Sequence, residues 1–397
     1  MEFLYRCSEC SKEFEIEPSL MVCPVCSQKQ DKQSPLRGVL DVAFSGDYIG
    51  NSGIPEFLPV EKKFFPPIPV GNTPLWRPEN LRRELGYSQL FLKDDTLNPT
   101  GSLKDRASFL VAAFAKKFGI KNIVVASTGN AASSMAGVGA AAGLSVTIFI
   151  PKSAPKAKMI QSLQYGAKVI LVDGNYDAAY ELSLEYSQTK GGLNRNTAFN
   201  PLTIEGKKTV ALEIFFQLGG KLPYYVFVPV GDGVILSGVY KGFRDLVELG
   251  LTERVPTIYA VQSEKSDAIC RAFEAGYFEP ISASTIADSI SVDVPRNGFH
   301  AVKQLKKFGG RCVRVSDDEI LSAQKLLASS SGLFAEPAGA ASLAGFIKVY
   351  ERIPKNANVV LLATGNGLKD IDSAAKGVIV PEEPICSITQ IASTRKI

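Results

Sequence analysis

The sequence predicts an α/β protein built from parallel sheets, and three observations lead to this class. Six short runs are almost entirely apolar, which is typical of strands buried on both faces. Helix-length segments separate these runs along the chain. The chain has 397 residues, enough for two domains. The predicted strands are Asn122–Ser127, Ser145–Ile150, Ala167–Val172, Tyr224–Val230, Thr257–Val261 and Asn358–Thr364, and the predicted helices include Asn130–Ala142, Ala154–Tyr165, Tyr176–Gln188 and Val234–Leu249.

The N-terminal segment carries four cysteines in two Cys-x2-Cys pairs. Cys7 and Cys10 form the first pair, and Cys23 and Cys26 follow after twelve intervening residues. Four thiolates in this pattern can converge tetrahedrally on Zn²⁺. We therefore expect a zinc-ribbon-like segment over residues 1–32, the alternative being two surface hairpins with free thiols. Residues 33–70 are rich in Pro and Gly and are expected to form a linker.

Composition excludes several classes of function. Lys and Arg total 44 against 40 for Asp and Glu, which is too even a balance to indicate nucleic acid or an anionic membrane surface as a partner. No apolar run approaches the roughly 20 residues of a membrane span, and the charged N-terminus does not resemble a signal peptide, so a cytoplasmic location is expected. Since His300 is the only histidine, chemistry that needs two imidazoles is excluded, and His300 itself is not assigned to a site.

Three loops at predicted strand ends have the residues of a binding site. Ser127, Thr128 and Asn130 follow one strand, a glycine-rich loop at residues 231–235 follows another, and Thr364 follows the last. In parallel sheets, ligands bind beyond the carboxyl ends of the strands. Glycines and helix N-termini at such places present backbone N–H groups to an anion.

Lys104, in the stretch LNPTGSLKDR, is the candidate nucleophile. It stands at the start of a predicted helix, where the macrodipole lowers the pKa of an amine and favours Schiff-base chemistry. For an isolated lysine, the alternative is an ordinary solvated side chain. The combination of Lys104 with the three loops, however, predicts a binding site for pyridoxal 5'-phosphate (PLP). In that site Lys104 holds the aldehyde, the glycine loop the phosphate, Asn130 the ring hydroxyl and Thr364 the ring nitrogen.

Five motifs resemble fold-type-II PLP enzymes of the tryptophan synthase β-like family, and among them the threonine synthases. They cover roughly residues 71–372 and read NPTGSLKDRAS, ASTGNAASSMA, IEGKKTVALEI, AEPAGAASLAG and LLATGNGLKD. The resemblance implies two three-layer αβα domains with PLP in the cleft between them. It also implies a reaction in which O-phospho-L-homoserine and water give L-threonine and phosphate.

The resemblance also implies the roles of individual residues. Lys104 would be catalytic and bind the cofactor. Lys158 is expected among the substrate-binding residues as a candidate to compensate for a missing phosphate ligand, and the spacing of the four cysteines predicts a structural Zn²⁺. The remaining cofactor ligands would be Asn130, Gly231, Asp232, Gly233, Val234, Ile235 and Thr364, and the remaining substrate ligands Ser127, Thr128 and Asn130.

Two departures from the family pattern stand in this chain. The phosphate loop contains Asp232, so backbone amides are expected to bind the phosphate while the carboxylate points away. Thr203 replaces an arginine that close threonine synthases can carry for the substrate phosphate, and Arg195, Lys158 and Lys207 are the candidates to compensate.

The expected architecture divides the chain around the cleft. Residues 71–96 and 200–380 would form the large PLP-binding domain, residues 97–199 the small domain, and residues 381–397 a C-terminal tail. A homodimer that binds a small amino-acid phosphate is expected from the fold-level resemblance.

Two alternatives remain open at this point. The first is a related PLP enzyme, either a cysteate-synthase-like β-replacement enzyme acting on phosphoserine or a serine/threonine dehydratase. The second is a zinc-ribbon binding protein on a catalytically silent scaffold, against which the setting of Lys104 argues.

Overall fold

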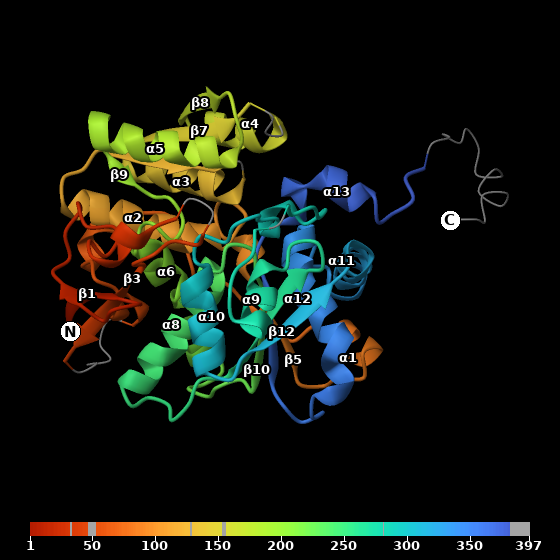
Figure 1. Ribbon diagram of the computed structural model, residues 1–397. Helices are drawn as coiled ribbons and strands as arrows, with labels where there is room; N and C mark the ends of the chain where they lie inside the picture. Colours follow the sequence, from red (N-terminus) through yellow and green to blue (C-terminus); the bar gives the residue numbers. More distant parts are fainter. Residues whose placement is uncertain (32–33, 47–52, 128, 153–155, 281, 382–397) are drawn as a thin grey trace.

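Three sheets form the framework of the protein. The computed structural model describes residues 1–31, 34–46, 53–127, 129–152, 156–280 and 282–381 (Figure 1). Its strands are β1 (Glu2–Cys7), β2 (Glu13–Phe14), β3 (Leu40–Ser45), β4 (Leu75–Trp76), β5 (Leu90–Asp94), β6 (Asn122–Ala126), β7 (Ser145–Pro151), β8 (Lys168–Val172), β9 (Leu193–Asn194), β10 (Tyr225–Pro229), β11 (Thr257–Ser263), β12 (Arg311–Val315) and β13 (Val359–Ala363). Its α-helices are α1 (Glu79–Glu84), α2 (Lys104–Lys117), α3 (Asn130–Ala142), α4 (Lys156–Gln164), α5 (Tyr176–Lys190), α6 (Leu202–Lys207), α7 (Thr209–Gln217), α8 (Val234–Glu248), α9 (Ala268–Ala275), α10 (Gly298–Lys307), α11 (Asp317–Ser331), α12 (Pro337–Val349) and α13 (Ile371–Ala375).

The larger sheet has six strands in the order β12-β11-β10-β13-β5-β4. Neighbouring strands run parallel except at the edge, where β4 is antiparallel to β5. Helices α1, α11 and α12 pack against one face of the sheet, and α7, α8 and α10 pack against the other. Both faces are therefore buried, which is why a central strand such as β10 (YVFVP) is wholly apolar.

The smaller sheet has four parallel strands in the order β8-β7-β6-β9. Helix α5 covers one face, and α2 and α3 cover the other. In Figure 1 this sheet and helices α3–α5 lie above the six-stranded sheet. All six predicted strands are found and the α/β class is confirmed, whereas β4, β5, β9 and β12 of these two sheets are not among the predicted runs.

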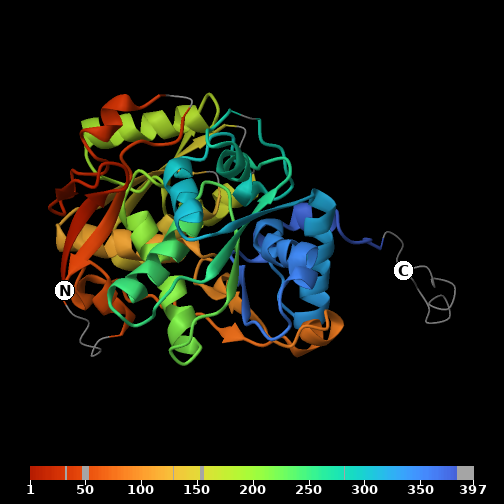
Figure 2. The same cartoon turned by 60° about the horizontal axis from the view of Figure 1, so that its bottom comes forward.

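The N-terminal segment forms the third sheet, of antiparallel strands in the order β2-β1-β3. Strand β3 comes from the segment predicted to be a linker, and it pairs along the whole of β1. Tyr5 and Val42 of this sheet share an apolar core with Leu110 of α2. Figure 2 shows the segment (red) lying along one side of the molecule, so it is packed on the core. No helix in the described ranges is long and apolar enough to cross a membrane.

Candidate active site

A cavity of about 150 Å³ lies where the carboxyl ends of β6, β10 and β13 meet the N-terminus of α2. The wall contains the predicted residues that the structure describes with their side chains: Lys104, Ser127, Asn130, Gly231, Asp232, Gly233, Val234, Ile235 and Thr364. Thr128 lies outside the described residues, as does the side chain of Lys158. Segments more than 250 residues apart in sequence thus meet at one place because parallel strands end at the same edge of a sheet.

Lys104 is the first residue of α2, and the turn before it is tied down on both sides. The Asp105 carboxylate accepts hydrogen bonds from the Thr100 backbone N–H (2.8 Å) and hydroxyl (2.5 Å). On the other side, the Leu103 N–H donates to the Thr364 carbonyl at 2.9 Å, which fixes the start of α2 against the end of β13.

The charge state of Lys104 is set by its surroundings. Burial lowers the pKa of its amine, and the positive charge of Arg195 acts in the same direction, while Glu336 and Asp232 oppose the shift. Desolvation by burial is the largest cause of this lowered pKa, whereas the sequence predicts the shift from the helix dipole. The outcome is an amine that loses its proton more readily than an ordinary lysine.

The glycine loop between β10 and α8 forms an uncapped helix start. Gly233 is the N-cap residue with φ of 85°, and no side chain caps the helix. The first N–H groups of a helix have no intrahelical acceptor, so they are free to bind an anion in the cavity. A Cβ on Gly233 would lie 2.9 Å from the Ala301 methyl group, so both the positive φ and the packing require glycine here.

Asp232 lies in this loop, and its side chain is bound by the backbone of residue 296. One carboxylate oxygen accepts a hydrogen bond from the Arg296 backbone N–H, and the other is buried without a hydrogen-bond partner among the described residues. Burial raises the pKa of the Asp232 carboxyl to about 6. The Asp232 carboxylate is thus hydrogen-bonded to the backbone of residue 296, and the backbone N–H groups at the start of α8 remain available to bind an anion in the cavity.

Glu336 is a site residue that sequence reasoning missed. It lies just before α12, is 3% exposed, and accepts two hydrogen bonds from the Asn130 side-chain amide, at 2.9 and 3.0 Å. The Ser289 hydroxyl donates to the same carboxylate at 3.2 Å. An acid followed by Pro337 reads as an ordinary helix cap, but the Glu336 side chain makes no cap hydrogen bond. Apart from the AEPAG motif, the sequence therefore gives no sign that Glu336 belongs to the site.

Gly365 makes room for this carboxylate. A Cβ on Gly365 would lie 2.3 Å from Glu336 Oε1, much closer than real contacts allow. The Glu336 N–H also donates to the Gly365 carbonyl at 2.8 Å. The glycine of the ATGNG string is therefore required by close approach of its backbone to Glu336.

Two further cations line the cavity beside Lys104. Arg195 is fully buried; its Nε donates to the Ser108 hydroxyl at 3.4 Å, but its Nη2 has no partner among the described residues. Lys207 is 1% exposed, and its amine donates to the Thr203 carbonyl at 3.0 Å. Burial lowers the pKa of Arg195 to about 10 and the pKa of Lys207 well below its usual value.

Thr203, which stands in place of the expected arginine, does not reach the cavity. Its side chain is fully buried, and its hydroxyl donates to the Asn200 carbonyl at 2.8 Å. Arg195 and Lys207, two of the three residues named as substitutes, are in the cavity wall instead.

The chain matches a known protein family, and this match identifies the cofactor of the cavity. Residues 68–365 match the family described as "Pyridoxal-phosphate dependent enzyme". The chain belongs to this family of PLP-dependent enzymes. PLP is accordingly the cofactor that the cavity must accommodate.

Curated relatives and solved structures agree with this assignment. The chain is 34% identical to a threonine synthase of Methanocaldococcus jannaschii over 392 residues, which is 96% of each chain. It is 38% identical to a threonine synthase of Halalkalibacterium halodurans, over 82% of this chain and 90% of that protein. The fold is similar to that of a processed threonine deaminase isoform from Solanum lycopersicum, with a TM-score of 0.66, 25% identity and coverage of 78% and 88% of the two chains.

The residues of the cavity fit PLP. An amine with a lowered pKa lies in the wall for the aldehyde, and an uncapped helix N-terminus lies in the same wall for the phosphate. Thr364, 6% exposed at the end of β13, offers a neutral hydroxyl of the kind that can face a pyridine nitrogen.

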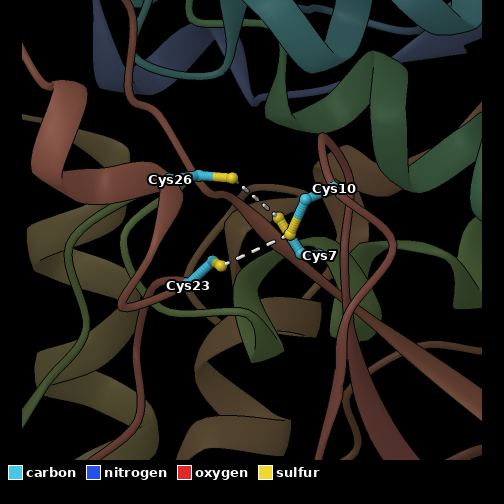
Figure 3. A group of neighbouring side chains, drawn as sticks. All are labelled: Cys7, Cys10, Cys23 and Cys26. Carbon is cyan, nitrogen blue, oxygen red and sulfur yellow. Dashed lines mark hydrogen bonds between the residues drawn. The ribbon is translucent and has the colours of Figure 1, made fainter.

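The four N-terminal cysteines form a separate cluster at the end of β1, and none of them lines the active-site cavity. Their sulfur atoms all lie within 4.8 Å of one another and point toward a common centre (Figure 3). Cys7 and Cys26 sulfurs are 3.9 Å apart, and Cys10 and Cys23 sulfurs 3.7 Å. Four thiolates at about 2.3 Å from a tetrahedral Zn²⁺ would be about 3.8 Å apart, so the donor set has the size of a zinc site.

Proposed function

We propose that the protein is a threonine synthase, which converts O-phospho-L-homoserine and water into L-threonine and inorganic phosphate. Two independent kinds of support meet here. The two curated relatives named above are threonine synthases, and they match 96% and 82% of this chain. The cavity also provides Arg195 and Lys207 beside Lys104, and these two basic side chains are the observation that supports a phosphorylated substrate.

The cations are needed because two phosphate groups must be buried together. A buried anion is costly unless it is paired and hydrogen-bonded. The free amides at the start of α8 serve the cofactor phosphate, and the open Nη2 group of Arg195, with the Lys207 amine, serves the phosphate of the substrate. Charge-assisted hydrogen bonds of this kind are the strong ones.

The protein side chains then divide the work of the reaction. When bound, PLP supplies the electron sink that acidifies the carbon atoms of an attached amino acid. Lys104 binds the aldehyde, and its amine, once free, accepts the proton from Cα and moves protons at Cβ, because its lowered pKa leaves it available as a base. Asn130 holds the ring hydroxyl and Thr364 meets the ring nitrogen.

Orientation and water exclusion come from the remaining residues. Ser127 and Asn130, together with the predicted ligands Thr128 and Lys158, contact the substrate. Arg195 and Lys207 stabilise the leaving phosphate at Cγ. Closure of the small domain, residues 97–199, over the large domain, residues 71–96 and 200–380, keeps water out until it is needed at Cβ.

The same cations also favour a second candidate, a β-replacement enzyme acting on O-phospho-L-serine. That substrate carries the same phosphate and amino acid groups on a shorter chain. A serine or threonine dehydratase has no phosphate for Arg195 and Lys207 to bind, and is disfavoured for that reason.

Direct assay of the PLP-loaded enzyme distinguishes these functions. With O-phospho-L-homoserine we expect phosphate and threonine in equal amounts, and neither product in Lys104→Ala. Lys116→Ala, an exposed lysine on the same helix, is the matched control and should retain activity. Phosphate release from O-phospho-L-serine without threonine formation would favour the second candidate, and a keto acid from L-serine or L-threonine would favour a dehydratase.

Three further predictions complete the proposal. The cysteine cluster holds one structural Zn²⁺, since its sulfurs have the spacing of a tetrahedral site. The enzyme is a homodimer, which sedimentation of the holoenzyme tests. Its expected location is the cytoplasm.

A further inference from the structure

A short segment, residues 34–39, contacts the cysteine cluster on one side and the glycine loop region of the active site on the other. We call it the bridging segment. It belongs to the stretch that the sequence predicts as a linker, yet Pro35, Gly38 and Val39 are buried. Loops usually run over the surface, so a buried one is held by specific contacts.

Both Cys-x2-Cys pairs hold the bridging segment through its backbone. The Ser8 N–H, inside the first pair, donates to the Val39 carbonyl at 2.9 Å. The Cys23 N–H, in the second pair, donates to the Gly38 carbonyl at 2.8 Å. Gly38 has a φ of 69°, and a Cβ there would lie 3.0 Å from the Cys23 Cβ. The bridging segment therefore packs directly on the residues that would hold the metal.

Glu9 lies between the two cysteines of the first pair and binds the same segment. Its carboxylate accepts hydrogen bonds from the Gly38 N–H at 2.5 Å and from the Arg37 guanidinium at 3.1 Å. Its own N–H donates to the Cys7 sulfur at 3.4 Å. One residue thus joins a candidate metal ligand to the bridging segment, so a change at the cluster must move the segment.

The other side of the bridging segment contacts the glycine loop region. The Leu36 N–H donates to the Arg296 carbonyl at 2.8 Å, and the Arg296 N–H donates in turn to the Asp232 carboxylate in the glycine loop. Val39, 1% exposed, belongs to the same buried apolar cluster as Val234, and Leu36 packs against this cluster. Val234 is the first residue of α8 and lines the cavity. The position of the segment therefore affects the start of α8.

The glycine loop binds an anion well only while its backbone donors are already aimed into the cavity, because ordering them on binding costs affinity. A four-cysteine segment obtains much of its order from its metal, since the binding free energy of a structural zinc is also folding free energy. The bridging segment contacts both places, so order imposed at the cluster reaches the glycine loop.

We propose that the bridging segment positions the glycine loop for PLP, and that metal binding by the cysteine cluster fixes the segment in place. Leu36 and Val39 are positioning residues, since neither lines the cavity. Zn²⁺ at the cluster strengthens the binding of PLP, and PLP strengthens the binding of Zn²⁺ by the same factor, because coupling between two sites is reciprocal. The coupling requires the zinc site proposed above but not the threonine synthase reaction.

Titration of the full-length apoprotein with PLP, followed by cofactor absorbance, measures this coupling. One sample is loaded with Zn²⁺, and the other is treated with a chelator that is then removed. We expect the dissociation constant of PLP to rise about fivefold or more when zinc is removed.

A pair of matched variants locates the coupling in the bridging segment. Val39→Ala removes methyl groups from the cluster with Val234, and should weaken PLP binding while the zinc content stays unchanged. Val42→Ala, also 1% exposed but in β3 and outside that cluster, is the control and should bind PLP like the wild type. Zinc removal should weaken PLP binding less in Val39→Ala than in the wild type, because both changes interrupt the same contacts.

Three results would overturn the coupling: equal PLP affinity with and without zinc, a protein that binds no zinc, or equal weakening of PLP binding in Val39→Ala and Val42→Ala. If zinc removal unfolds the N-terminal sheet, the comparison of the two variants still gives the answer, since both retain the metal. None of these results depends on whether the active site makes threonine.

Discussion

Replacing Glu336 by glutamine tests how the structure positions Asn130. The carboxylate accepts both contacts from the Asn130 amide, at 2.9 and 3.0 Å, and a third from Ser289 at 3.2 Å. Glutamine keeps the shape and one acceptor oxygen, but its own NH₂ group would face the NH₂ group of Asn130. Asn130 would then turn away from the direction in which it meets the ring hydroxyl of PLP.

The magnitude follows from the bonds that change. A hydrogen bond to a charged group contributes about 1.5–3 kcal/mol. Because about 1.4 kcal/mol corresponds to a factor of ten, kcat/KM for threonine formation should fall roughly 10- to 150-fold in Glu336→Gln. The thermal midpoint of unfolding should stay near that of the wild type, since a buried carboxylate that is costly to desolvate is replaced by a neutral side chain of the same size.

A pH measurement separates positioning from a merely structural effect. The negative charge of Glu336 raises the pKa of Lys104, so its removal should lower that pKa further. Attachment of PLP to the apoprotein needs the neutral amine, and its pH dependence should shift to lower pH in Glu336→Gln. Glu274→Gln, a control at an exposed position, should change neither quantity. Full activity with an unshifted pH profile would refute the role assigned to Glu336.

The remaining predictions concern the cradle, the ATGNG glycine and the cysteine cluster. Since burial raises the pKa of Asp232 to about 6, the folded apoprotein holds this proton more tightly than the unfolded chain does. The free energy of unfolding should therefore fall as the pH rises from about 4 to about 6. Thermal unfolding of Asp232→Asn should not show this fall. Gly365→Ala should cost at least as much kcat/KM as Glu336→Gln, because its Cβ would lie 2.3 Å from Glu336 Oε1, whereas Gly377→Ala, where the nearest atom to the Cβ is 3.3 Å away, is the control. Elemental analysis should find one zinc per chain; Cys10→Ser should reduce both zinc content and thermal midpoint, and a variant that loses no zinc would contradict the tetrahedral site.

The elements of the two parallel sheets were predictable because burial on both faces leaves a strong pattern. Strand β6 was expected over residues 122–127 and is found at Asn122–Ala126, and α3 is found at the predicted Asn130–Ala142. Strand β12 (RCVRV) was missed because Arg311 and Arg314, in a strand at the edge of the sheet, interrupt the apolar run. Strand β3 was missed because its partner, β1, precedes it by more than 30 residues, and only pairing makes the segment a strand.

The sequence by itself predicted the cofactor class, and it predicted that Lys104 and the glycine loop lie at one site, as they do in the cavity wall. These features are local: a turn, a helix start and the residues that follow a strand can each be recognised within a short stretch of sequence. The spacing of the cysteines likewise indicates a four-thiolate cluster.

Tertiary structure decided what depends on distance between remote segments. Glu336 reaches Asn130 across more than 200 residues of sequence, and the open guanidinium of Arg195 meets the cavity while Thr203 does not. Burial and charge act through space, so a pKa, an unsatisfied atom or a shared anion site is set only when the chain has folded.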